Sequence, residues 1–123
     1  LSMRYNNALI KNRSECAVAD YKGTSTEVII PSTYNGSSVT EIVSNAFSNN
    51  KNIVTVYIPD TVTSIGTRAF YGCTGLTEIT IPASVTSIGT QVFYKASNLS
   101  TVYYDSTYCD TSNPFLNLAH ITK

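Results

Sequence analysis

The sequence predicts a β-rich repeat solenoid, in which copies of one short unit stack on each other through compact helical corners. The chain matches itself at a shift of 23 residues: IPDTVTSIGTRAFYGCTGL, which begins at residue 58, returns as IPASVTSIGTQVFYKASNL from residue 81. Apolar positions coincide in the two copies, and polar residues alternate with them in the strand segments. A unit this short cannot bury a core alone, so the copies must stack.

Each unit begins with a strand and continues into a second extended piece. In the strand LTEITIP, residues 76–82, alternation places Leu76, Ile79 and Ile81 inward and the intervening polar residues outward. The second piece, VTSIG at 85–89, points Val85 and Ile88 inward, and we expect Gly89 to supply a bend.

The unit closes with the corner AFYGCTGL, residues 69–76. Phe70, Cys73 and Leu76 recur at a spacing of three, which predicts a tight helical or 3₁₀ turn with these side chains on its inner side. Tyr71 and Tyr94 occupy equivalent corner positions, and we expect them to pack between units.

An earlier copy precedes this pair, since the strand VIIP at 28–31 lies 28 residues before VYIP at 56–59. The five extra residues predict an insertion whose turn has Asn35 and Gly36 at its tip. Towards the C-terminus the strand pattern continues over 100–105. It then degrades, and Asn113-Pro114 indicates the start of one more short turn.

We therefore expect one domain over residues 1–123, with three parts. Residues 1–24 would form an N-terminal β-hairpin cap around the turn KNR. Residues 25–104 would form the repeats, and residues 105–123 a degenerate C-terminal repeat or cap. The hairpin would cover the open end of the stack, which would otherwise promote aggregation.

Composition disfavours several kinds of partner. Eight basic and eight acidic residues give a net charge of zero without a basic run, so nucleic acid is not an expected partner. The chain has no apolar run of about 18 residues, so we expect no membrane insertion within it. Residues 1–10 lack the pattern of a signal peptide, so the signal of an exported protein would lie outside this chain.

The cysteines and the histidine predict no cofactor, metal site or catalytic triad. Cys16 and Cys73 fit buried core positions, because a free cysteine behaves as a small hydrophobe. Cys109 is the expected exposed thiol, with a disulfide-linked dimer as an alternative. His120 is the only histidine, and we expect it on the surface.

The candidate binding residues are the outward side chains of the strands, which the repeat brings into one column: Ile29, Tyr57, Thr80 and Tyr103. Aromatic and branched side chains among hydroxyl groups are typical of a recognition surface. Thr55 and Glu78 complete the predicted site. The alternative is that these residues only suit a strand.

Two further outward patterns suggest other activities, which we disfavour. Glu27 and Glu78 would lie roughly 10 Å apart, near the spacing of an inverting glycosidase pair, but an open sheet provides nothing that would prepare one of them as the acid. The residues Thr40, Thr63 and Thr86 form a column that could suggest an ice-binding face, yet the column is single and interrupted in the fourth rung.

The pattern IxIPxxVTxIGxxAFxxCxxLxxI resembles the BspA-like class of leucine-rich repeats over residues 25–104. Departures are Asn50 and Ala96 at the corner cysteine, Val92 in place of alanine and Asp105 in place of proline. The resemblance implies a right-handed leucine-rich-repeat solenoid, found in surface and secreted proteins, that recognises other molecules and carries no catalytic residues.

We therefore expect a non-enzymatic recognition or adhesion module of a secreted or cell-surface protein. It would bind a protein or a glycan through the strand face. One alternative is a structural spacer that forms part of a longer repeat array. A glycan-active or ice-binding solenoid is the remaining alternative.

Overall fold

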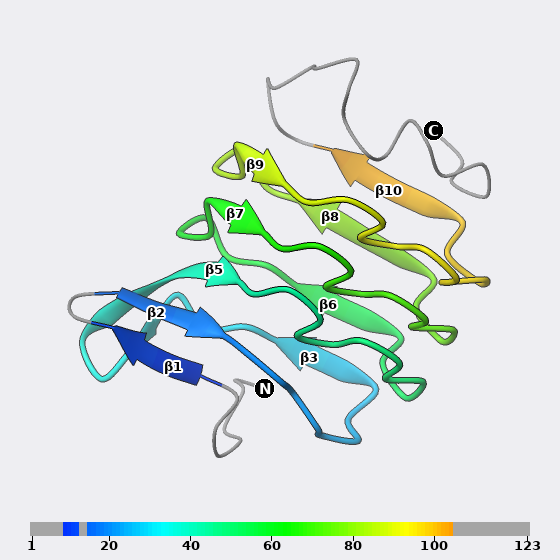
Figure 1. Cartoon of the computed structure of the whole chain (residues 1–123), viewed down its shortest axis with the longest axis horizontal. Coiled ribbons are helices and arrows are strands. Elements are labelled where there is room, and N and C mark those ends of the chain that lie inside the picture. Colours follow the sequence, from blue (N-terminus) through cyan, green and yellow to red (C-terminus); the bar gives the residue numbers. More distant parts are fainter. Residues whose placement is uncertain (1–8, 13–14, 105–123) are drawn as a thin grey trace.

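The protein is a parallel β-solenoid of about four turns, as the repeat predicted. The computed structural model describes residues 9–12 and 15–104. Figure 1 shows the turns, here called rungs, stacked so that equivalent strands of successive rungs lie side by side. The expected C-terminal cap, with Asn113, Cys109 and His120, lies outside the described residues.

Two sheets run the length of the stack. The first sheet is entirely parallel and contains, in spatial order, β3 (Glu27–Ile29), β6 (Thr55–Tyr57), β8 (Glu78–Ile81) and β10 (Thr101–Tyr104). The second sheet follows the order β1 (Leu9–Asn12), β2 (Glu15–Val18), β5 (Ser37–Ile42), β7 (Ser64–Ile65) and β9 (Ser87–Ile88). β4 (Thr33–Tyr34) pairs antiparallel with β5.

Backbone pairing keeps the register of the sequence repeat. Thr55 pairs with Glu78, and Glu78 pairs with Thr101, each 23 positions further on. Between β3 and β6 the offset is 28, because the β4–β5 hairpin absorbs the five extra residues. Its tip has positive φ at both Asn35 (49°) and Gly36 (82°), the pattern of a type I′ turn.

The core lies between the two sheets and the corners, and the inward positions are those that the sequence predicted. Leu76, Ile79, Ile81 and Val85 are at most 2% exposed, whereas Ile88 is partly buried. One phenylalanine from each corner joins a stack along the solenoid axis. Ring centroids lie 5.1 Å apart for Phe47 and Phe70 and 5.7 Å apart for Phe70 and Phe93.

The corners are tight turns with some 3₁₀ character, as the spacing of three predicted, but they are not continuous helices, and the described residues contain no helix. The amides of Ala46, Ser48 and Asn50 each donate to the carbonyl three residues back, as in a 3₁₀ turn. The amides between them donate instead to the next rung, as in Phe47 N to Ala69 O at 2.8 Å. Two residues of this corner, Asn45 and Asn49, have a positive φ, and the amides of both donate to the next rung.

The glycine of the second extended piece does not act through a bend. Neither Gly66 nor Gly89 has a positive φ, but a Cβ atom at Gly89 would overlap the backbone of Thr67 in the preceding rung. A Cβ atom at Gly66 would likewise overlap the backbone of Ser44. These glycines are therefore required because the backbones of successive rungs approach closely.

The N-terminal segment forms the expected antiparallel hairpin, with Leu9 opposite Val18. It also does something that the sequence did not indicate, because β2 continues the second sheet in parallel with β5. The Tyr21 ring packs against the end of the phenylalanine stack, tilted by 49° with its centroid 5.2 Å from that of Phe47, and the Tyr21 amide donates to Ala46 O. Residues 15–29 thus form an additional, irregular rung.

Replacing the central ring of the stack tests this core. Phe70 is fully buried between two rings, so Phe70→Ala should lower the free energy of unfolding by about 3 to 5 kcal/mol through lost burial and a cavity. Urea denaturation followed by circular dichroism measures the change. Tyr57→Ala, which removes a 57% exposed ring, is the control and should cost no more than about 1 kcal/mol. A near-neutral Phe70→Ala would contradict the stack.

The buried thiol of Cys73 makes a second prediction. Burial raises the pKa of Cys73 from 9.0 to about 12, so above pH 9 the unfolded chain loses a proton that the folded chain keeps. The stability that comes from keeping the thiol neutral is fully present below pH 9. It falls by about 1.4 kcal/mol per pH unit between pH 9 and 12. Denaturation of wild type and Cys73→Ala at pH 8 to 10.5 should show the wild-type advantage shrinking; parallel pH profiles would exclude a buried neutral thiol.

Candidate binding surface

The first sheet brings the predicted binding residues together on its outer face. Ile29 pairs with Tyr57, and Thr80 pairs with Tyr103, so the four form the expected column across β3, β6, β8 and β10. Tyr57 is 57% and Tyr103 52% exposed, while Ile29 is only partly exposed. Two large aromatic side chains therefore project from a sheet whose opposite face is core.

Thr55 and Glu78 lie beside this column in the adjacent outward row. Thr55 pairs with Glu78 on one side and with Glu27 on the other, so the two glutamates flank it two strands apart. Both carboxylates are exposed to solvent. An exposed carboxylate pair lacks the low-dielectric surroundings that prepare one member as a general acid.

A groove of about 230 Å³ lies beside Tyr57. Thr55 and Thr80 line it with Tyr57, together with Glu27, Asp60 and Pro82. No lysine or arginine borders this groove, so its charge is acidic. The groove joins three of the six predicted site residues in one depression.

Sequence reasoning missed Asp60 and Pro82 as part of this surface. Asp60 follows one Ile-Pro strand end, and Pro82 belongs to the next. The repeat pattern indicates only a structural role for such a strand end. The available clue was a difference between copies, because the residue after the proline is Asp60 in one rung and Ala83 in the next. A charge that breaks an otherwise regular repeat is a candidate functional residue.

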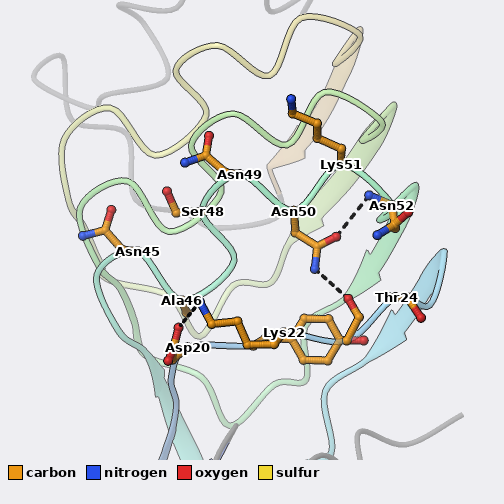
Figure 2. A pocket seen from close by; sticks show the side chains of 12 residues that line it. Asp20, Lys22, Thr24, Asn45, Ala46, Ser48, Asn49, Asn50, Lys51 and Asn52 are labelled. Carbon is orange, nitrogen blue, oxygen red and sulfur yellow. Dashed lines mark hydrogen bonds and ion pairs between the residues drawn. The ribbon is translucent and has the colours of Figure 1, made fainter.

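A second depression, here called the polar hollow, was also missed. It encloses about 700 Å³ beside the first corner (Figure 2). Its lining residues are Asp20, Tyr21, Lys22, Gly23, Thr24, Asn45, Ala46, Ser48, Asn49, Asn50, Lys51 and Asn52. The sequence clue is the asparagine-rich run over 44–52. Later rungs have Tyr71 and Tyr94 at the position that Ser48 occupies here.

Several contacts fix the walls of the polar hollow (Figure 2). Asn50 stands where the next rung has Cys73, and its Nδ2 donates to Gly23 O at 3.0 Å. Its Oδ1 accepts the amide of Asn52 at 3.1 Å. Lys22 and Asp20 form an ion pair at 3.1 Å on the rim, where both side chains are largely exposed.

The remaining candidates take structural places. Cys16 and Cys73 are buried, and the Cys73 thiol donates to Phe47 O at 3.1 Å, as expected for core positions. The amide of Thr63 donates to Thr40 O, and that of Thr86 to Thr63 O, so the threonine column exists and its backbone groups link successive rungs. Tyr71 and Tyr94 pack between rungs, with centroids 5.9 Å apart.

Over the described ranges, no three His, Cys, Asp or Glu side chains converge as a metal site would require. Within the same ranges, the structure has no helix of the length and apolar character needed to cross a membrane.

Comparison with solved structures identifies similar bacterial proteins. A leucine-rich cell-surface protein from Faecalibacterium prausnitzii is 32% identical with a TM-score of 0.67, over 84% of this chain and 32% of that one. A leucine-rich repeat protein from Eubacterium ventriosum is 31% identical with a TM-score of 0.68, over 83% and 28%. The chain thus spans about a third of the length of these structures. Among curated proteins no relative matches.

The pattern that resembled BspA-like repeats is matched by the family model itself. The model of the BspA type leucine rich repeat region matches six copies over residues 21–122. With the observed solenoid and its 23-residue register, this match covers most of the molecule. The chain belongs to the BspA-type leucine-rich repeat family.

Proposed function

We propose that the chain is a non-enzymatic recognition module that binds a protein or glycan through the outer face of the first sheet. The observation that carries the proposal is the pair of exposed tyrosines, Tyr57 and Tyr103, on an otherwise hydroxyl-rich and acidic sheet. Rigid aromatic side chains supply contact area at low entropic cost, while neighbouring threonines supply adaptable hydrogen bonds.

The family supports recognition or a structural role, and one of the similar structures is a cell-surface protein. Both observations support our proposal that the chain acts at or outside the cell surface. The exposed carboxylates of Glu27 and Glu78 serve recognition rather than catalysis in this proposal, because neither lies in a site that excludes water.

A second candidate is a structural spacer within a longer array. It is favoured by the chain's share of the similar structures, 32% of one and 28% of another. A spacer would keep the stacked core but would need no particular side chain on the outer face of the first sheet.

A capture experiment distinguishes the two roles. The wild-type chain is passed over immobilised extracellular-matrix proteins and neutral glycans, and binding is measured by surface plasmon resonance. The double variant Tyr57→Ser/Tyr103→Ser should lose capture, since it removes both anchors. Its free energy of unfolding should stay within about 1 kcal/mol of wild type, because both rings are about half exposed.

Tyr34→Ser is the matched control, because Tyr34 is 41% exposed but lies on the β4–β5 hairpin away from the first sheet. It should retain capture. If the double variant captures as well as wild type, the site lies elsewhere. If wild type captures nothing on the panel, the spacer role is favoured.

A further inference from the structure

The three complete corners form a face of uniform charge sign, here called the corner face. Residues 43–52, 66–75 and 89–98 contain no aspartate or glutamate but include Lys51, Arg68 and Lys95. The groove on the first sheet has the opposite character, with Glu27 and Asp60. The two faces therefore suit ligands of opposite charge.

Aromatic rings hold the cations of the second and third corners in place. The Arg68 guanidinium lies 5.2 Å from the centroid of Tyr71, and its Nε donates to Gln91 Oε1 at 2.7 Å. The Lys95 ammonium lies 5.9 Å from the rings of both Tyr71 and Tyr94. Within the described part of the chain neither cation has an ion-pair partner. The charges are positioned but not neutralised.

Three side chains of the corner face sit on a backbone conformation that does not favour them. Two columns of the corners are left-handed: the first contains Asn45, Arg68 and Gln91, and the second Asn49, Gly72 and Lys95. Asparagine and glycine tolerate a positive φ, whereas arginine, glutamine and lysine adopt it at a cost. The unfavourable residues gather around the tyrosine pair, and strain of this kind is typical of functional positions.

The polar hollow adjoins this cluster. The amide of Asn45 donates to Thr67 O, and that of Asn49 to Tyr71 O. The Asn49 side chain also lies against Gly72, where a Cβ atom would overlap it. A continuous track therefore runs from side-chain amides in the first corner to cations and rings in the next two.

We propose that the corner face is a second binding surface, for an acidic oligosaccharide that carries carboxylate or sulfate groups. Arg68 and Lys95 would bind its anionic groups through charge-assisted hydrogen bonds. Sugar hydroxyls would form hydrogen bonds with the side-chain amides of Asn45 and Asn49. Sugar rings would pack on the face of Tyr94, which is 43% exposed. An acidic peptide would use the cations but not the track of amides and rings.

Two substitutions that restore the repeat's own residues test the proposal. Arg68→Asn and Lys95→Asn each introduce the residue that the first corner has at the equivalent position. The double variant should therefore fold, with an unchanged or higher melting temperature. Isothermal titration at physiological salt uses a heparin hexasaccharide and a polygalacturonate hexasaccharide. Binding to at least one is expected, and the double variant should weaken it by about tenfold or more.

Two variants complete the design. Tyr57→Ser/Tyr103→Ser alters only the first sheet, so it should bind the oligosaccharide as wild type does. Tyr94→Ser should weaken binding. The proposal is overturned if wild type binds neither oligosaccharide, or if polyglutamate binds equally well. It is also overturned if the double variant loses no affinity.

Discussion

The solenoid depends on hydrogen bonding between each rung and the rung 23 residues further along. This register operates in both sheets, as in Thr55 with Glu78, and also in the corners, where every second amide crosses to the next rung. Because one backbone position always meets its equivalent, each side chain stacks on a side chain of the same role. The phenylalanine stack, the tyrosine column and the left-handed columns all follow from that single constraint.

The same register explains why much of the fold could be predicted from the sequence. Alternation fixes which residues of a strand face inward, and the repeat confirms each assignment in another copy. Ile79 and Ile81 were assigned in this way, and both are buried. The column that contains Tyr57 was likewise deduced by counting positions. Whether that column binds a ligand is a matter of affinity, which counting does not determine.

The differences arose where neighbouring rungs, and not local sequence, decide the conformation. The spacing of Phe70, Cys73 and Leu76 is that of a 3₁₀ helix, but bonds to the next rung compete for half of the corner amides. The pattern predicts that Gly89 supplies a bend, whereas close contact with the backbone of the preceding rung is what requires a glycine there. Tyr21 joins the phenylalanine stack although its distance from Phe47 does not fit the repeat, so self-alignment could not reveal it.

The asparagine at the first corner has a consequence for how the array is ordered. Asn50 stands at the position of the buried cysteine, and its side-chain amide donates to the carbonyl of Gly23. This partner belongs to the N-terminal segment. In the next corner the equivalent Cys73 is fully enclosed and bonds within the stack. The copies are consequently not interchangeable modules. The side-chain amide of Asn50 suits the copy that lies next to the N-terminal segment. Recombination that reordered the rungs would therefore be constrained at the position of Asn50.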